Sequence, residues 1–213
     1  MNVLNGIPQS LWSLRSGISS RLGQSARKQI IGMVLVPTIM FSLPPVARAQ
    51  ANLPGEYELK AAFLFNFAKF IDWPPNSLAS PQSLFTICVL GQDPFGHLLD
   101  DQLQGKMIGS RHLAVQRLKS NADARRCQVV FVSASEAVHV PEILESLRGA
   151  NVLLVGETNG FAASGGAIEF TVEDNHIRFV INTDAADRAG LKFSAKLLSL
   201  AKVVHDEGHL KGG

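Results

Sequence analysis

The sequence predicts an α/β domain built on a mixed sheet of about six strands flanked by helices, with a C-terminal β-hairpin and a long C-terminal helix. Three observations predict it. Short, fully apolar runs alternate with helical segments, which is typical of parallel strand pairs in α/β sheets. Two later runs alternate apolar and polar residues around a turn sequence, which indicates an antiparallel hairpin. The last segment places apolar residues at helical spacing.

The segment that precedes this domain, residues 1–49, has the pattern of a secretory signal peptide. It contains five cations and no acidic residue, and an uncharged apolar run over 30–43 follows the cations. This run is shorter than the about 20 residues that a membrane-spanning helix needs. The small-residue site that ends at Ala49 predicts cleavage there, with Gln50 as the first mature residue. An uncleaved N-terminal anchor is the alternative, and both place the rest of the chain outside the cytoplasm.

Removal of this segment reverses the charge of the protein. Residues 50–213 hold all eighteen acidic residues but only fifteen of the twenty cations, so the mature chain has a net charge of about −3. No basic surface is left to indicate nucleic-acid binding. The length of this part suits a single domain with its own core, and we assign it as one domain.

The chain contains two cysteines, Cys88 and Cys127, and both lie in the exported part. An even pair in an oxidising compartment predicts a disulfide. Each cysteine lies at the edge of an apolar strand-like run, so adjacent strands would bring the two within bonding distance. A bridge that closes a loop of this length contributes roughly 4 kcal/mol on the chain-entropy model. The alternative is two buried free thiols on separate strands. A redox-active pair is disfavoured because the Cys-x-x-Cys spacing is absent.

The domain is predicted to open with a helix over Glu56–Trp73, which a proline pair ends. Phe63, Phe67 and Phe70 share one face, and the other faces are also largely apolar. A helix that is apolar nearly all round is buried or packs against a second chain. Core packing and a partner or dimer surface are therefore equally supported for this helix.

The middle of the chain is predicted to supply the parallel strands. A turn and a short helix through Leu99 and Leu103 follow the first strand. A helix capped by Ser135 that runs to Gly149 follows the third, and Pro141 lies in its first turns or starts a second helix there. A polar segment connects the second and third strands. The four strands are expected over 85–90, 112–118, 128–133 and 152–155.

The end of the chain is predicted to form the hairpin and the long helix. The hairpin pairs 168–172 with 177–181 across a polar turn. Thr183 or Asp184 is expected to cap the C-terminal helix, which ends at Gly208.

No arrangement of residues predicts catalysis. Only His205 and His209 have an i, i+4 spacing among the six histidines, and the glutamate of a zinc-protease motif is absent. The glycine-rich stretch 156–166 lacks the phosphate-loop patterns and is expected to be a structural loop. We therefore expect a protein that is not an enzyme, with no catalytic residue, no metal ligand and no cofactor.

Several blocks of this sequence resemble, in the same order, the YfiR family. They cover nearly all of residues 56–204, and several independent blocks in order make the resemblance specific. The first block is the run from Lys60 to Phe70 followed by Trp73-Pro74. The later blocks are Cys-Val-Leu-Gly-Gln-Asp-Pro-Phe-Gly from Cys88, Val-Leu-Leu-Val-Gly from Val152, Gly-Phe-Ala-Ala-Ser-Gly-Gly from Gly160, Arg-Phe-Val-Ile-Asn from Arg178, and the segment from Ala185 to Leu198.

The resemblance implies a periplasmic regulatory domain with an α/β sandwich fold that is often a homodimer. Such proteins bind the periplasmic part of a membrane-bound diguanylate cyclase and restrain it, which limits cyclic-di-GMP signalling and biofilm formation. Outer-membrane lipoproteins can sequester these repressors. The spacing of Cys88 and Cys127 fits the pairing of the family. The best-known member has a second cysteine pair, at positions that are Ala162 and Glu169 here.

The resemblance also leaves a second function open, because the family serves as the sensory input region of other signalling proteins, such as a histidine kinase. In that case the chain would be a periplasmic module for a small ligand, with a pocket near the Gly160–Gly166 loop and the face of Asn66 and Lys69. For both functions, the residues expected to contact the partner or ligand are Phe63, Asn66, Phe67, Lys69, Trp73, Phe161, Arg178 and Asn182.

Overall fold

The computed structural model describes residues 55–75 and 83–206. The predicted signal peptide and its cleavage site between Ala49 and Gln50 lie outside these residues. By its contacts the chain divides into residues 1–48 and 49–213, and every described element belongs to the second unit. Among the described residues, no helix combines the length and the apolar character needed to cross a membrane.

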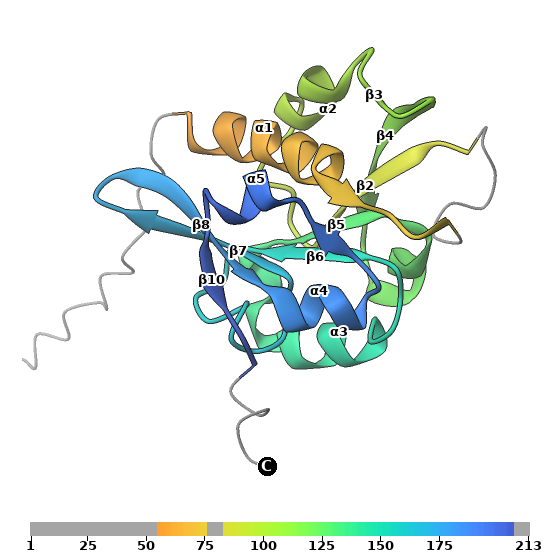
Figure 1. Cartoon of the computed structure of the whole chain (residues 1–213). Coiled ribbons are helices and arrows are strands. Elements are labelled where there is room, and N and C mark those ends of the chain that lie inside the picture. The colour runs from red at the N-terminus through yellow and green to blue at the C-terminus, as the bar shows by residue number, and fades with distance from the viewer. Residues whose placement is uncertain (1–54, 76–82, 207–213) are drawn as a thin grey trace, which may run out of the picture. The chain divides into compact units, whose positions relative to one another are not determined.

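An eight-stranded mixed sheet forms the centre of the domain, in the order β10-β8-β7-β6-β5-β2-β4-β3 (Figure 1). The strands from β4 to β7 are parallel, β8 runs antiparallel to β7, and β10 adds parallel to β8. The six predicted strands are confirmed, and the short edge strands β3 and β10 complete the sheet. The bounds are β2 (Phe85–Leu90), β3 (Met107–Ile108), β4 (Arg111–Leu118), β5 (Val129–Val132), β6 (Leu153–Gly156), β7 (Ile168–Glu173), β8 (His176–Asn182) and β10 (Lys202–Val204).

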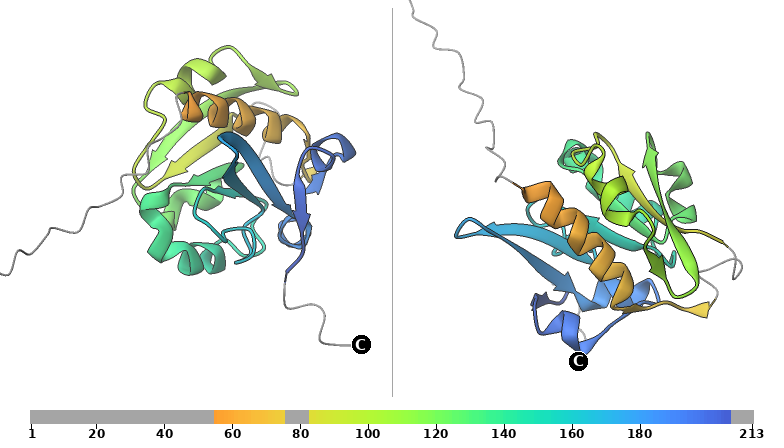
Figure 2. Two further views of the ribbon diagram at one scale, coloured as in Figure 1. Left: turned by 90° about the vertical axis from the view of Figure 1, so that its left-hand side faces the viewer. Right: turned by 90° about the horizontal axis from the view of Figure 1, so that it is seen from above.

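The two faces of the sheet are covered by different helices (Figure 2). The helices α1 (Glu56–Lys69) and α2 (Leu98–Leu103) pack on one face. The short helices η2 (Asn121–Arg126), η3 (Ala134–His139) and α3 (Val140–Ser146) cover the other face. Successive residues of a strand point to opposite faces, so β2, β5 and β6 are buried along their whole length. This explains why their sequences are uniformly apolar.

The first helix is shorter than predicted. It ends at Lys69, and Ile71–Asp72 form strand β1, which pairs antiparallel with β9 (Lys192–Phe193) in a separate two-stranded sheet. The indole Nε1 of Trp73 donates to the carbonyl oxygen of Ala68 at 2.9 Å. This bond satisfies one of the carbonyl groups that a helix end leaves unpaired. The pairing with a distant strand, rather than the proline pair, therefore decides where the helix ends.

Most of the apolar coat of α1 is explained by core packing. Leu64 and Phe67 are fully buried, and the ring of Phe63 lies against Phe170 and Phe179 of the hairpin. On α1, Leu59 keeps substantial exposure, at 45%. The helix is apolar nearly all round because the sheet, the hairpin and α2 surround it.

The predicted long C-terminal helix is wrong. The segment forms α4 (Thr183–Arg188), β9, α5 (Ala195–Leu198) and β10 in its place. Gly190 has a left-handed backbone with a φ of 69°, which ends α4, and the side chain of Leu191 is then fully buried in the core. Burial of Leu191 and strand pairing by β9 and β10 give the chain apolar contacts that a continuous surface helix cannot make. The cap of α4 is Asn182, whose Oδ1 accepts the N–H of Ala185 at 3.0 Å.

The helix predicted after the third strand is divided in two. Ser133, not Ser135, provides the cap, since its side chain accepts the N–H of Ser135 at the start of η3. Pro141 lies in the first turn of α3, where its missing N–H has no intrahelical partner to lose.

Arg117 on β4 ties the turn after β2 to α2. Its Nε lies 2.9 Å from Oδ2 of Asp93 and its Nη1 lies 2.9 Å from Oδ1 of Asp100. Its Nη2 donates to the carbonyl oxygen of Gly96 at 2.7 Å. The hydrogen bond from Arg117 lowers the pKa of the Asp100 carboxyl and, from the other side, raises the pKa of the guanidinium.

We expect the substitution Arg117→Met to destabilise the protein in a pH-dependent way. Because the folded pKa of Asp100 is below its unfolded value, the stabilisation is present at neutral pH and is lost as the pH falls through the folded pKa. Both side chains are more than one-third exposed, at 37% and 49%, so solvent screening reduces the effect. The expected loss is about 1 kcal/mol at neutral pH and becomes small only once the pH is below the folded pKa, so the acid measurement is made at about pH 2. Urea denaturation at both pH values measures it.

Arg126→Met is the matched control for this prediction. Arg126 is 83% exposed and its ion pair with Asp123 spans 3.6 Å. We expect no measurable change from this control at either pH. An equal loss for Arg117→Met at both pH values would contradict the electrostatic origin of the effect.

Candidate functional site

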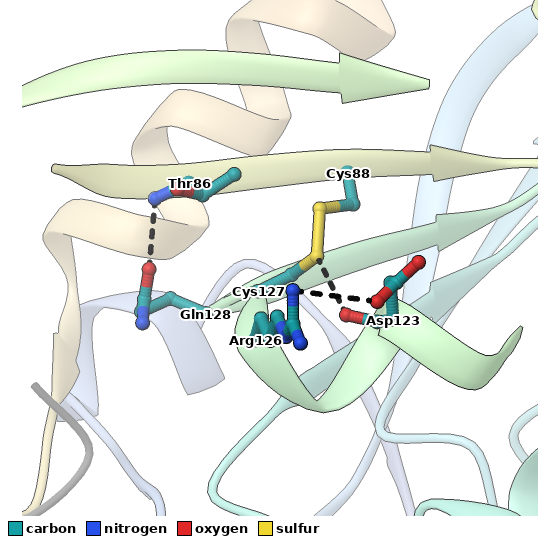
Figure 3. Close-up of a disulfide and its surroundings, with 6 residues drawn as sticks. All are labelled: Thr86, Cys88, Asp123, Arg126, Cys127 and Gln128. Atoms are coloured by element: carbon teal, nitrogen blue, oxygen red, sulfur yellow. Dashed lines mark hydrogen bonds and ion pairs between the residues drawn. A yellow bond between two sulfur atoms is a disulfide. The ribbon is translucent and has the colours of Figure 1, made fainter. Parts of the chain in front are cut away.

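The predicted disulfide is confirmed and joins two neighbouring parallel strands (Figure 3). Cys88 lies in β2, Cys127 lies two positions before the start of β5, and their Cα atoms are 6.0 Å apart. Both residues are buried, at 0% and 2% exposure. Next to the bridge, Oε1 of Gln128 accepts the N–H of Thr86 at 2.8 Å, so a side chain joins the same two strands a second time. The alternative of two free thiols does not hold for this structure, and the bridge is a buried structural bond.

The carboxyl ends of the parallel strands are the usual place for a ligand in α/β sheets, and here a charged cluster of the protein fills it. Glu157 follows β6, and one of its oxygens lies 2.7 Å from Nζ of Lys60 and 3.2 Å from the hydroxyl of Tyr57. Its other oxygen accepts the N–H of Ala134 at 3.0 Å. Lys60 also pairs with Glu56 at 2.5 Å. We call Glu56, Tyr57, Lys60 and Glu157 the Lys60 cluster.

The Lys60 cluster is almost completely shielded from water. The side chains of Lys60 and Glu157 are 4% and 6% exposed. Burial raises the pKa of Tyr57, and the charge of Glu157 raises it further, so the phenol stays protonated and donates its hydrogen bond. The Glu157 carboxylate thus accepts hydrogen bonds from a lysine, a phenol and a backbone N–H. These contacts hold α1 against the ends of β5 and β6.

Five of the eight residues expected at a binding site are mainly packing residues in this structure. Phe63, Phe67 and Trp73 belong to the core under α1 or pack against it. Phe161 is 1% exposed, and its ring lies so close to Gly166 and Gly156 that a Cβ at either glycine would approach the ring within 2.5 Å. This explains Gly156 and Gly166 as a packing requirement of the Phe161 ring. Asn182 is fully buried and caps α4, while its Nδ2 donates to the carbonyl oxygen of Ala162 at 2.7 Å.

The other three expected residues are accessible, but they lie on separate elements. Asn66 is half-buried and Lys69 exposed near the end of α1, and Arg178 is exposed on β8. The structure does not bring the Asn66 and Lys69 face to the Gly160–Gly166 loop as one pocket. A role of these eight residues in binding stays a prediction.

A cleft that the sequence did not reveal lies between α3 and α4 and has a volume of about 560 Å³. It lies near the amino ends of β6 and β7, at the other end of β6 from Glu157. Part of the predicted loop, 163–165, forms one wall. Arg148 and Arg188 stand at its rim. Small residues are the sequence feature that makes room for the cleft, but their spacing along the chain does not show that they come together. They are Ala163, Gly165, Ala167, Ala185 and Ala189.

The residues described here contain no group of three or more histidine, cysteine or acidic side chains that could hold a metal ion. The structure is a mixed α/β domain with a buried disulfide between neighbouring strands. Residues 57–202 match the family model described as YfiR/HmsC-like, and the chain belongs to this family. Members of the family are in general non-catalytic regulators. The family and the disulfide indicate a location outside the cytoplasm.

The solved structures similar to this chain are distant. A domain from Streptococcus pneumonia, described as an ABC domain in complex with L-Trp, is 12% identical, with 68% of this chain and 60% of that chain covered and a TM-score of 0.49. A conserved domain protein from Vibrio cholerae is 13% identical, with 69% and 59% covered and a TM-score of 0.48. The substrate binding protein CD0873 of Clostridium difficile is 9% identical, with 57% and 55% covered and a TM-score of 0.39. This chain thus spans about 60% of the first two, and likenesses at this level support no functional argument.

Proposed function

We propose that this chain is an exported regulatory protein that binds the periplasmic part of a membrane-bound diguanylate cyclase and restrains it. Membership of the YfiR/HmsC-like family over residues 57–202 is the observation that carries the proposal. The disulfide between β2 and β5 is consistent with work in an oxidising compartment. Restraint of the cyclase lowers cyclic-di-GMP and limits biofilm formation. A homodimer and sequestration by an outer-membrane lipoprotein belong to the same proposal.

Deletion of the gene in the host organism tests this function directly. We expect cyclic-di-GMP to rise and to return to its original level when the intact gene is restored. The purified exported protein should also retain a membrane diguanylate cyclase of the same organism in a pull-down. Unchanged cyclic-di-GMP in the deletion strain would overturn the proposal.

Charge reversal at the two exposed cations expected to bind a partner locates the surface. Lys69→Glu and Arg178→Glu change exposed side chains, so both variants should fold normally. Like charges placed at an interface weaken association, so we expect a loss of repression for a variant whose residue lies in the interface. Arg126→Glu is the control, because Arg126 is exposed on η2 and is not among the expected residues. If the control loses repression as fully as both variants, the effect comes from net charge and not from the surface.

A second candidate function is a small-ligand sensor that feeds another membrane signalling protein, such as a histidine kinase. The cleft between α3 and α4 favours it, because its volume of about 560 Å³ lies within the range of small-molecule pockets. Binding of a ligand by the purified protein, with no effect of the deletion on cyclic-di-GMP, would favour this second function.

A further inference from the structure

The cleft between α3 and α4 combines an apolar floor with fixed charges at its rim. Val152 and Leu154 of the β6 region and Leu147 of α3 are buried, at 4%, 8% and 3% exposure, and they line the cleft. These side chains belong to the smaller hydrophobic core, which therefore reaches the surface at this place. An apolar floor with a small number of polar groups is the usual composition of a ligand pocket.

The cleft is open because small residues face it from two elements. Ala185 of α4 and Ala189, directly after α4, line the cleft together with Ala163 and Gly165 of the loop. Gly165 has a φ of 109°, a conformation that residues with a side chain rarely adopt. A Cβ at Gly165 would lie 3.5 Å from Nη2 of Arg188, so the guanidinium lies close to the loop. The space is thus left by the backbone and by alanines, so it does not depend on the conformation of any one long side chain.

Arg188 is held in place at the mouth of the cleft. Its Nη1 forms an ion pair with Oδ2 of Asp206, which is itself positioned by Nδ2 of Asn182 at 2.6 Å. The N–H of Asp206 donates to Oδ2 of Asp184 at 2.9 Å. The ion pair with Asp206 uses Nη1 of the guanidinium. The N–H groups of Nε and Nη2 have no hydrogen-bond acceptor among the described residues, so they can donate to a ligand. These two nitrogens form the side-on fork that binds a carboxylate with two parallel hydrogen bonds.

Arg148 supplies a second and looser cation on the other wall. It pairs with Glu145 at 3.1 Å, and the two side chains are 70% and 68% exposed. An exposed pair of this kind contributes little stability, so Arg148 can turn toward an anion in the cleft at small cost.

We propose that this cleft binds a small organic carboxylate. The carboxylate accepts two hydrogen bonds from Nε and Nη2 of Arg188, and the apolar body of the ligand covers Val152 and Leu154. The inference deepens the second candidate function and rests on it, but it does not depend on the identity of the signalling partner. It assigns the ligand class from the fixed guanidinium and the apolar floor together, since either one alone would accept a simple anion or a neutral apolar molecule.

Paired probes test this ligand class with the purified exported protein. Isothermal titration calorimetry compares octanoate and 3-phenylpropionate with their alcohols, octanol and 3-phenylpropanol, and with propionate, which lacks a large apolar body. We expect at least one of the two larger carboxylates to bind, and to bind more tightly than its own alcohol and than propionate. The amide resonances of residues 163–165 should shift on binding. If neither carboxylate binds more tightly than its alcohol, the inference is overturned.

Variants then place the binding at this cleft. Arg188→Gln removes the fork, and we expect affinity to fall about tenfold or more, while Arg188→Lys keeps the charge and recovers only part of it. Ala189→Leu fills the cleft with Arg188 intact and should also abolish binding, so a loss of fold in one variant leaves the other as a test. Thermal melting identifies any variant that does not fold. Arg126→Gln changes an exposed residue of η2 that does not line the cleft, and it should leave affinity unchanged. Full affinity in a folded Ala189→Leu variant would place the ligand elsewhere and overturn the site.

Discussion

The double substitution Cys88→Ala with Cys127→Ala is expected to lower the free energy of unfolding by about 4 kcal/mol. The bridge spans 39 positions of sequence, and a loop of this length loses about that much conformational freedom in the unfolded chain. This is a large part of the total stability of a domain of this size. Both cysteines are buried, so alanine leaves no unsatisfied polar group behind. Urea denaturation of the double variant and of the unreduced protein measures the difference.

A thiol titration checks that the bridge is present in the protein used for this comparison. Unfolded, unreduced protein should show no free thiol, and reduction should release two. The free energy of unfolding of the single variant Cys88→Ala should be lower than that of the unreduced protein by nearly the same about 4 kcal/mol, because one substitution already breaks the bridge. A double variant that unfolds at the same urea concentration as the unreduced protein would show that the bond adds nothing to stability.

The substitution Lys60→Met is expected to destabilise the protein by about 3–5 kcal/mol. Methionine fills a similar volume, so packing is largely kept. The change removes the cation between Glu56 and Glu157, whose carboxylates lie 2.5 and 2.7 Å from Nζ. Two largely buried carboxylates, 9% and 6% exposed, then lose the cation that lies between them. Desolvation of an unpaired charge costs several kcal/mol, far more than an exposed ion pair contributes.

Two further variants test the electrostatic cause. Lys69→Met changes an exposed lysine on the same helix and should leave the free energy of unfolding unchanged. Glu157→Gln in the Lys60→Met background removes one of the two charges and keeps the acceptor of the Ala134 N–H, so it should restore part of the stability. If this double variant regains no stability, lost packing at Lys60 causes the destabilisation, and the loss of the cation beside the two carboxylates does not.

Local sequence patterns were sufficient to predict the strands that are buried on one face or on both faces. The runs at 85–90 and 128–133 are apolar because both sides of the central strands are covered, and apolar continuity marks that situation directly. The hairpin was predictable because its strands pair with their sequence neighbour through a short turn. The disulfide was predictable for a different reason, because a chain with two cysteines, each at the edge of a buried strand, allows only one internal pair.

The prediction of a long C-terminal helix was wrong because this segment is shaped by strand pairing and not by its local pattern. Leu191, Ala195 and Leu198 have helical spacing, but β9 pairs with β1 and β10 pairs with β8, more than 100 residues away in the first case. No window along the chain contains both partners of such a pairing. The Lys60 cluster was missed for the same reason, because Lys60 and Glu157 are 97 residues apart. A charged pair on a predicted helix reads locally as solvent-exposed, and only the packing of α1 over the ends of β5 and β6 buries it.

The sequence by itself determined the two cysteines and their pairing, the six main strands and the family. All of these depend on residues that act through their neighbours or on blocks that keep their order. The tertiary structure alone decided that α1 ends at Lys69 and that the expected C-terminal helix is divided at Gly190. It also decided that a lysine and two glutamates occupy the space at the carboxyl ends of the parallel strands. It also decided that alanines from α4 and a distant loop leave a cleft beside Arg188. The physical reason is common to these features: burial and empty space are properties of surfaces that meet only after folding.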